Sequence, residues 1–378
     1  MKKYFIHIAV FLLMLIPASH AAYIDTDAEV AVVIDGHTGK VLFSKDKDKK
    51  TYPASMTKIM TTLIIFEKLA NETLSLDDKF LVSEKAWRER EGSSMFVEVD
   101  KEIRVEDLLR GIIVQSGNDA CIVVAENIAG TEESFAKMMT QKAKEIGMKN
   151  TNFTNSTGMY DKDNYSTVYD IALLSMHLIN EYPQYYHLFA ETEFEWSGIK
   201  QNNRNSLLYK NMGVDGLKTG HLSKSGYGLA ASAVDQNRRV ISVVNGFEST
   251  QKRTQGSSRL ITWAFREFTN LKLFEKEDIV GQVEISGASS KESDVSTGEE
   301  IIITVPKSKR DGLTTNIVVD DNISAPLNAG DKVGYLEISV PGEENQTYEL
   351  YATNEIDRSN IFVRFFNYLI NLILSLFN

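Results

Sequence analysis

A serine followed three positions later by a lysine recurs along this chain, and one copy lies where the pair could perform acyl-transfer chemistry. Ser55 and Lys58 fall at the predicted start of a helix, where residues three apart share a face. Because residues 56–66 are largely apolar, that helix is expected to be buried. Burial lowers the pKa of a lysine, so a neutral Lys58 could accept the proton of the Ser55 hydroxyl.

The spacing of this pair is not informative by itself. The same separation occurs at Ser44/Lys47, Ser134/Lys137, Ser197/Lys200 and Ser249/Lys252. For these four copies, a helix-capping or surface serine followed by an exposed lysine is the simpler interpretation. The Ser55 copy differs because Pro53 precedes it and an apolar helix follows.

Two further short motifs follow Ser55 and Lys58 in the chain. Ser116-Gly117-Asn118 lies between two predicted helices, and Lys218-Thr219-Gly220 lies on a predicted strand; each pattern occurs once. Ser-x-x-Lys, Ser-x-Asn and Lys-Thr-Gly, in this order, are the three motifs of the penicillin-recognising serine enzymes. Any one of them could arise by chance, but three in the same order favour a shared chemistry.

The residues around these motifs extend the likeness to a family. The chain resembles the low-molecular-mass penicillin-binding proteins that act as serine-type D-Ala-D-Ala carboxypeptidases. The resemblance covers residues 25–270, where the motifs are highly specific for this family. The stretches that carry this resemblance are Tyr52-Pro53-Ala54-Ser55-Met56-Thr57-Lys58-Ile59-Met60-Thr61, Gly92-Ser93-Ser94-Met95-Phe96, Gln115-Ser116-Gly117-Asn118-Asp119-Ala120 and Asp215-Gly216-Leu217-Lys218-Thr219-Gly220-His221.

The resemblance implies a catalytic role for three residues. Ser55 would attack the carbonyl between two terminal D-alanines, and Lys58 would take its proton. The backbone N–H groups of Ser55 and His221 would form the oxyanion hole. Ser116 would pass a proton to the departing D-alanine, and water would then hydrolyse the acyl-enzyme.

The resemblance also implies a set of substrate-binding residues. Asn118 would hydrogen-bond the acyl side of the peptide, and Lys218 would supply positive charge near Ser116. Thr219 and Arg253 would hold the terminal carboxylate, since a guanidinium can grip a carboxylate through two parallel hydrogen bonds. Gly220 completes the Lys-Thr-Gly motif and belongs to the same set of substrate-binding residues. Arg253 could instead be a surface arginine, and Tyr227 fits a core aromatic at the start of a strand better than a cleft residue.

Helices and strands that would position these residues can be read from the apolar periodicity. Residues 28–35 and 40–45 alternate on either side of a Gly-rich turn and predict a β-hairpin. The helical ranges are 105–115, 120–128, 133–146, 167–181 and 257–273, and the later strands are 213–219, 227–234 and 239–247. The fold class expected is α/β. The resemblance implies a β-lactamase-like penicilloyl-serine transferase domain over residues 22–274, with an antiparallel sheet and a helical subdomain.

Beyond residue 274 the pattern changes to short β-like runs separated by Ser, Gly, Asp and Pro. These runs, at 279–285, 300–305, 315–319, 332–338 and 348–351, predict a small all-β domain over residues 275–354 that carries no candidate chemistry.

Both ends of the chain have the composition of membrane-related segments. Lys2 and Lys3, an apolar stretch and small residues at Ser19 and Ala21 predict a signal peptide over residues 1–21; an uncleaved anchor is the alternative. Residues 355–378 are expected to include an amphipathic helix that attaches the protein to the outer face of the cytoplasmic membrane. A helix packed on the protein or a spanning helix are the other interpretations.

Composition excludes several classes of function. The formal net charge is −11, which disfavours nucleic acid as a partner, and the single cysteine, Cys121, lies in an apolar run typical of the core. One cysteine and six scattered histidines show no metal-ligand spacing, so no metal or cofactor is expected. The partners that the resemblance implies are peptidoglycan stem peptides and, as acylating inhibitors, β-lactam antibiotics.

Rival interpretations share the same nucleophile. A class A β-lactamase normally has Asp where Gly117 stands and lacks a C-terminal all-β domain. A wall-binding protein without activity, an endopeptidase and a transpeptidase would keep the same motifs. Leu222, where the family often has threonine, and Asn164-Tyr165-Ser166-Thr167, which lacks a common histidine, leave the substrate preference open.

Overall fold

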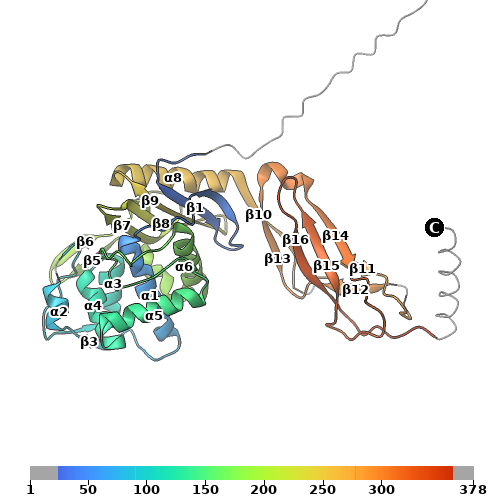
Figure 1. The fold of residues 1–378 in the computed structure, drawn as a ribbon, viewed down its shortest axis with the longest axis horizontal. Helices are drawn as coiled ribbons and strands as arrows, with labels where there is room; N and C mark the ends of the chain where they lie inside the picture. The colour runs from blue at the N-terminus through green and yellow to red at the C-terminus, as the bar shows by residue number, and fades with distance from the viewer. Residues whose placement is uncertain (1–23, 90, 277, 291, 361–378) are drawn as a thin grey trace, which may run out of the picture. The chain divides into compact units, whose positions relative to one another are not determined.

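The computed structural model describes residues 24–360 apart from 90, 277 and 291, and these residues form two units (Figure 1). The larger unit contains residues 24–280 and 297–305, and the smaller contains 281–296 and the described residues from Pro306 onward. The sequence places the boundary at residue 274, whereas the larger unit here also includes 275–280 and 297–305. The predicted signal peptide, and the predicted terminal helix from residue 361 onward, lie outside the described residues.

The larger unit is built on a five-stranded antiparallel sheet with the strand order β2-β1-β9-β8-β7. The strands are β1 (Val30–Asp35), β2 (Val41–Lys45), β7 (Val214–Leu222), β8 (Gly226–Asp235) and β9 (Arg238–Phe247). Successive side chains of a strand point to opposite faces of the sheet. In β1, Val32 and Ile34 therefore join one core cluster, while Ala31 and Val33 join another on the opposite face.

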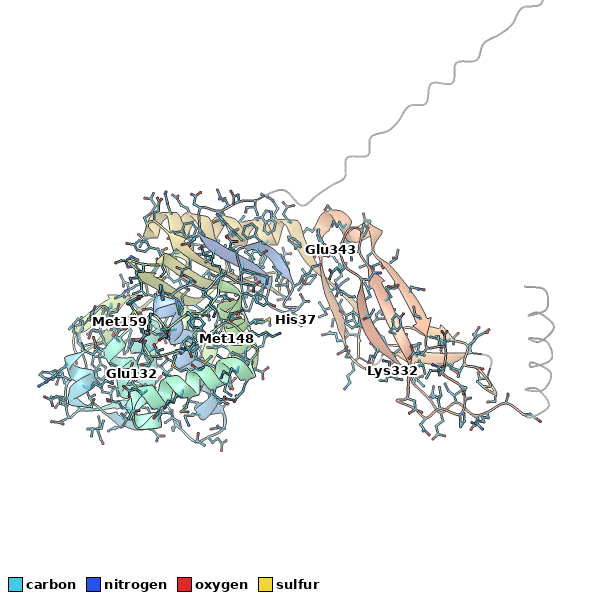
Figure 2. The ribbon with its side chains drawn as sticks, in the orientation of Figure 1. His37, Glu132, Met148, Met159, Lys332 and Glu343 are labelled. Atoms are coloured by element: carbon cyan, nitrogen blue, oxygen red, sulfur yellow. The ribbon has the colours of Figure 1, made fainter. Side chains whose placement is uncertain are left out.

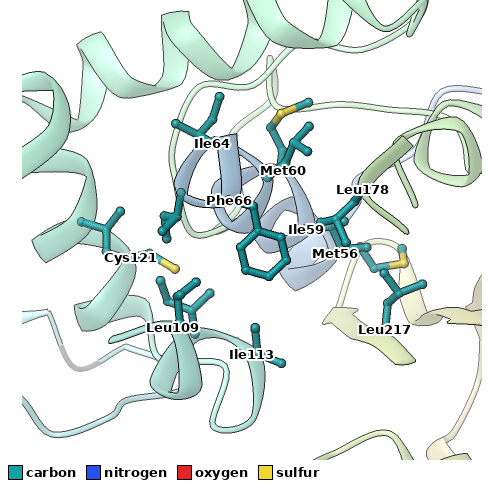
Figure 3. Packing of buried hydrophobic residues seen from close by; sticks show 14 of the residues in the cluster. Met56, Ile59, Met60, Ile64, Phe66, Leu109, Ile113, Cys121, Leu178 and Leu217 are labelled. Atoms are coloured by element: carbon teal, nitrogen blue, oxygen red, sulfur yellow. The ribbon is translucent and has the colours of Figure 1, made fainter. Parts of the chain in front are cut away.

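Helices cover both faces of this sheet, as Figure 1 shows. The helical elements before the last strands are α1 (Lys58–Ala70), α2 (Glu84–Arg88), α3 (Val105–Ile113), α4 (Asn118–Ala129), α5 (Glu132–Glu145), α6 (Val168–Glu181) and α7 (Pro183–Tyr186), with the 3₁₀ turns η1 (Ala54–Thr57), η2 (His187–Ala190) and η3 (Ser206–Tyr209). Helix α1 is buried on nearly every side, as its composition predicts. Figure 3 shows Ile59 and Phe66 of α1, and Met56 of the turn before it, packed in the core.

Two small two-stranded antiparallel sheets in this unit were not predicted. One pairs β3 (Lys79–Leu81) with β4 (Glu102–Arg104), and the other pairs β5 (Glu193–Trp196) with β6 (Ile199–Asn202). Strands of three or four residues carry too little alternation to be recognised from sequence.

The helix predicted over 257–273 was wrong at both ends. Helix α8 spans Thr250–Glu267, and Phe268–Phe274 forms the strand β10 instead. The helix starts early because the Ser249 hydroxyl caps it by accepting a hydrogen bond from the Lys252 N–H. It ends early because Phe268 is already extended, and β10 pairs with β13 (Ile301–Pro306). A partner about 30 residues away leaves no local sequence signal.

The smaller unit is a second five-stranded antiparallel sheet, in the order β11-β12-β16-β15-β14. Its elements are β11 (Gly281–Val283), β12 (Ser293–Ser296), the 3₁₀ turn η4 (Lys307–Gly312), β14 (Thr314–Val319), β15 (Lys332–Ser339) and β16 (Gln346–Ala352). Lys332 and Glu343, labelled in Figure 2, belong to this unit. The all-β character predicted for this region is confirmed, although β12 was missed. Among the described helices, none combines the length and apolarity needed to cross a membrane.

Candidate active site

The side chains of Ser55 and Lys58 meet in the structure. Ser55 lies in the 3₁₀ turn η1, and Lys58 is the first residue of α1. Lys58 is 0% exposed, and its Nζ lies 3.2 Å from Ser55 Oγ. The same Nζ donates to Asn118 Oδ1 at 2.7 Å and to the Thr157 carbonyl oxygen at 2.5 Å. The pair that the sequence singled out is thus within hydrogen-bonding distance, with Lys58 shielded from water and Ser55 partly exposed.

Burial lowers the pKa of Lys58 below its usual value of 10.5, because a desolvated ammonium is disfavoured. In the neutral amine, two N–H bonds can serve the oxygens of Asn118 and Thr157. The remaining lone pair then faces the Ser55 hydroxyl. This arrangement suits a general base that removes the proton of Ser55.

The segment that carries Thr157 is held against the nucleophile by its own turn. Asn155 Oδ1 accepts hydrogen bonds from the N–H groups of Thr157 and Gly158 and from the Thr157 hydroxyl. Gly158 has φ +81°, and a Cβ there would lie 1.9 Å from the Ala54 carbonyl oxygen. Only glycine allows the segment to pack this closely on η1 and to aim the Thr157 carbonyl at Lys58.

The Ser116-Gly117-Asn118 motif connects α3 to α4, as expected. Ser116 has φ +62°, an unfavourable conformation for a residue other than glycine, which is typical of functional sites. Its Oγ is buried without a hydrogen-bond partner among the described residues. Such an orphaned hydroxyl is poised to exchange a proton with a bound molecule.

Asn118 makes contacts that the sequence did not predict. Besides accepting from Lys58, its amide donates through Nδ2 to the Glu91 carbonyl oxygen at 2.8 Å. The next residue, Asp119, accepts from the N–H groups of residues 95–97 and from the Ser94 hydroxyl. The motif is therefore locked to the residue 91–97 loop, and one N–H of the Asn118 amide is left for a substrate.

The Lys-Thr-Gly motif forms one wall of the site on β7. A Cβ at Gly220 would lie 2.7 Å from the Pro53 carbonyl oxygen, so glycine lets β7 approach η1. Lys218 is buried on the same strand, and its pKa is well below 10.5, first through desolvation and then through the nearby charge of Lys58. The His221 ring stacks on Tyr227 with centroids 4.0 Å apart.

Arg253 is a buried cation of the site and not a surface residue. It lies in the first turn of α8 and is 5% exposed. Its NH2 donates to the Arg204 carbonyl oxygen at 3.4 Å, while its Nε has no partner in the described structure. Burial lowers its pKa from 12.5 to about 10. A guanidinium with an unused N–H, facing a cavity, is suited to bind an anion.

One cavity of about 700 Å³ brings these groups together. Seven of the nine predicted site residues line it; Lys58 and Lys218 lie buried behind its surface. The lining comprises Ser55, Gly92, Ser93, Ser116, Asn118, Gly158, Met159, Arg204, Ser206, Lys210, Thr219, Gly220, His221, Leu222, Tyr227, Thr250, Gln251, Arg253, Thr254 and Gln255. It includes Arg204, Lys210 and Arg253 but, within the part of the chain that is described, no carboxylate.

Sequence reasoning missed three contributors to the site. Tyr227, interpreted as core, lines the cavity, and so does Arg204, whose NH1 donates to Ser93 Oγ. The Thr157 carbonyl is also part of the site because it holds Lys58. A backbone oxygen and a loop arginine belong to no spacing pattern, so no sequence signal could have identified them.

Neither Cys121 nor a metal-binding cluster contributes to the site that the structure describes. Cys121 is buried as predicted, and burial raises its pKa to about 12, which keeps the thiol protonated. Over residues 24–360, apart from the three undescribed positions, no cluster of three or more His, Cys, Asp or Glu side chains could hold a metal ion.

Comparison with known proteins gives matches along both units. Residues 17–249 match the peptidase S11 family model, described as D-alanyl-D-alanine carboxypeptidase, and residues 268–358 match the C-terminal domain of penicillin-binding protein 5. The chain is 33% identical over 356 residues to the D-alanyl-D-alanine carboxypeptidase DacA of Haemophilus influenzae, covering 93% of this chain and 91% of that protein. It is 36% identical over 326 residues to the D-alanyl-D-alanine carboxypeptidase DacF of Bacillus subtilis, covering 84% of this chain and 82% of that protein.

Solved structures show the same likeness in three dimensions. Penicillin-binding protein 5 from Haemophilus influenzae superposes with a TM-score of 0.84 at 32% identity, covering 90% of this chain and all of that one. The D-alanyl-D-alanine carboxypeptidase DacD from Francisella tularensis gives a TM-score of 0.79 at 30% identity, covering 90% of this chain and 96% of that one.

Proposed function

Because the chain belongs to the peptidase S11 family of D-alanyl-D-alanine carboxypeptidases, we propose that its residues remove the terminal D-alanine of peptidoglycan stem peptides through an acyl-serine at Ser55. The chain is a serine hydrolase of this class, and the assignment of each step to particular side chains is our proposal. Its support is the arrangement of Ser55, Lys58 and Ser116 around one cavity.

Acylation begins when the Lys58 amine takes the proton of the Ser55 hydroxyl. Ser55 Oγ then forms a bond to the carbonyl carbon between the two D-alanines. The carbonyl oxygen becomes an oxyanion, which the backbone N–H groups of Ser55 and His221 stabilise. The Lys58 ammonium remains held by the oxygens of Asn118 and Thr157 while the negative charge develops.

Collapse of this intermediate breaks the C–N bond and releases D-alanine. The leaving nitrogen needs a proton, and the partnerless hydroxyl of Ser116 supplies it while accepting one from Lys58. Water then attacks the ester carbon, the C–Oγ bond breaks, and Ser55 regains its proton. The sequence of steps consumes one water and needs no cofactor.

Recognition of the terminal carboxylate falls to Thr219 and Arg253. Both line the cavity, and the Arg253 Nε has no protein partner in the described chain. Lys218 lies buried behind this wall. A penicillin carries a carboxylate beside a strained cyclic amide, so the same residues would guide its acylation of Ser55.

The observation that carries the proposal is the 3.2 Å contact between Lys58 Nζ and Ser55 Oγ inside a buried network. The test is intact-protein mass spectrometry after incubation with benzylpenicillin, with peptide mapping of the adduct. We expect one equivalent, located on Ser55. An adduct on another serine would overturn the assignment of the nucleophile.

Product analysis separates the rival activities. Incubation with a peptide ending in D-Ala-D-Ala should release free D-alanine. A non-catalytic wall-binding protein would take the penicillin label but would release no D-alanine from the peptide. A class A β-lactamase would destroy benzylpenicillin rapidly instead of retaining it. The match to carboxypeptidases along both units favours the first outcome.

We further propose that the protein is exported and held at the outer face of the cytoplasmic membrane by its C-terminal segment. The support is the signal-like composition of residues 1–21 and the polar stripe repeating every three or four residues between Asn360 and Asn378. Removal of residues 359–378 should release an active protein from membranes, and continued sedimentation with membranes would contradict the anchor.

A further inference from the structure

A lysine and two tyrosines form a cluster beside the cavity that the reaction described above does not use. Lys224 Nζ donates to the Tyr160 hydroxyl at 2.8 Å and lies 4.1 Å from the centroid of the Tyr160 ring. The Tyr160 ring packs edge-to-face on Tyr52, with centroids 5.1 Å apart. Tyr160 is nevertheless 44% exposed. The cluster therefore holds a cation in place at a surface that solvent, or a ligand, can reach.

Each of the three residues is close in sequence to a residue of the cavity. Tyr160 follows Met159, and Lys224 comes two residues after Leu222; both Met159 and Leu222 line the cavity, and Met159 is labelled in Figure 2. Tyr52 precedes Ser55 by three residues. Lys224 lies in the turn between β7 and β8, which the Ser225 N–H closes by donating to the Leu222 carbonyl oxygen. The cluster is thus on the rim of the cavity.

The order of groups along β7 shows which part of a substrate would reach this rim. Thr219 is assigned to the terminal carboxylate, and the N–H of His221 to the carbonyl that reacts. The acyl part of the peptide must then continue past Leu222, toward Lys224. Strand and peptide both advance about 3.4 Å per residue. Because β7 ends at Leu222 and Lys224 lies in the turn that follows, a peptide that runs along this strand brings the side chain of the residue preceding the D-Ala-D-Ala pair toward that turn.

The charge at this place has no counterion. No carboxylate of the described residues forms an ion pair with Lys224; its contacts are a neutral phenol and an aromatic ring. Asp161 and Asp163 influence the tyrosines only from farther away. The hydrogen bond from Lys224 is the main cause of the lowered pKa of Tyr160. The ammonium keeps N–H donors free while its position is fixed, which reduces the entropy lost on binding an anion.

We infer that Lys224 and Tyr160 form a subsite for a carboxylate on the side chain of the residue preceding D-Ala-D-Ala. The inference rests on the proposed function, because it uses the direction in which the peptide lies along β7. A side chain ending in a carboxylate is favoured there, and one ending in a free amine is repelled. Lys224 is a specificity residue in this account; the reacting atoms do not touch it.

Three matched peptides test the inference. Each is Nα-acetyl-L-lysyl-D-Ala-D-Ala, with the lysine Nε carrying a succinyl group, an acetyl group or no group, so that the end of the side chain is negative, neutral or positive. The measurement is kcat/KM for D-alanine release. An exposed ion pair is worth a factor of about two to five, so we expect the succinyl peptide to be preferred by that factor over the acetyl peptide. The preference should shrink as ionic strength rises.

Variants then assign the preference to this cluster. Lys224→Gln should remove the preference for the succinyl peptide, and Lys224→Glu should transfer it to the free amine. Tyr160→Phe keeps the packing on Tyr52 but removes the hydroxyl that holds Lys224, so it should weaken the preference partly. Lys162→Gln is the matched control: it removes an equal charge two residues from Tyr160 and should leave the ratio between peptides unchanged.

The outcomes separate this inference from the proposed function. If no peptide releases D-alanine and Ser55 takes no penicillin, the proposed function fails. If all three peptides react equally well, only the subsite is wrong. If Lys224→Gln lowers kcat/KM for all three peptides by one common factor, the cluster supports the fold of the rim and does not select a carboxylate.

Discussion

The two units of the chain differ in what they bury. The larger unit buries charged and polar side chains, among them Lys58, Lys218, Arg253 and Asp119. In the smaller unit, every side chain that the structure describes as buried is apolar, for example Leu336 and Leu350. Burying a charge is unfavourable unless partners compensate for it. The larger unit accepts this destabilisation where it performs chemistry, and the smaller one gains stability from apolar packing.

Removing the nucleophile should have the largest effect of any change. Ser55→Ala should lower kcat for D-alanine release by about 10⁴-fold or more, since members of a catalytic unit fail together. It should also abolish the covalent penicillin adduct, as measured by intact mass. Ser134→Ala, in the exposed Ser134/Lys137 copy of the spacing, is the control and should retain full activity. If both variants lost activity equally, the Ser55/Lys58 pair would not differ in function from the Ser134/Lys137 pair, and the assignment of Ser55 as nucleophile would be contradicted.

The base should reveal itself through pH. Below its pKa, Lys58 is an ammonium and cannot accept a proton; because burial lowers that pKa, the rate of penicillin acylation should rise with pH through a value below 10.5 and then level off. Lys58→Met should remove this rise and slow acylation by about 10²- to 10⁴-fold. Lys137→Met is the matched control. Persistence of the same pH rise in Lys58→Met would transfer the role of base to another group, of which buried Lys218 is the first candidate.

Loss of the buried guanidinium should have an intermediate effect. Arg253→Gln removes charge-assisted hydrogen bonds to the substrate carboxylate, which should lower kcat/KM by about 10- to 100-fold. A peptide amidated at its C-terminus should lose much less, because it lacks the negative charge that Arg253 is proposed to bind. Lys252→Gln changes the neighbouring exposed cation, which pairs with Glu248, and should act as wild type. If both substrates lose activity equally in Arg253→Gln, the residue supports the structure and not recognition.

An apolar truncation in the smaller unit should have the least effect on chemistry. Leu350→Ala removes a fully buried side chain and should reduce the free energy of unfolding of that unit by about 2–5 kcal/mol. The rate of penicillin acylation should stay within about two-fold, as expected when no group that touches the reaction changes. Leu63→Ala, the equivalent truncation in α1, should lower both stability and acylation. Urea unfolding and stopped-flow acylation of the full-length variants provide the two measurements.

Much of the site was predictable because its chemistry is concentrated in three short motifs. The motif order identified Ser55, Lys58, Ser116 and Lys218, and local apolar periodicity identified the helices and strands that carry them. The prediction failed where a structure depends on distant partners. Residues 268–274 became a strand because of β13, and Tyr227 lines the cavity because of the strand beside it.

The sequence by itself determined the type of reaction, since a helix-start serine and lysine together with two ordered motifs allow few other chemistries. Only the tertiary structure decided what tunes that reaction. The carbonyl of Thr157 and the amide of Asn118 reach Lys58 from segments 99 and 60 residues away, and burial from all sides lowers its pKa. In the same way, folding brings the turn after β7 close to Tyr160, so that Lys224 can donate a hydrogen bond to the Tyr160 hydroxyl. Covalent order specifies which groups are available, but desolvation and distance exist only after folding brings remote segments together.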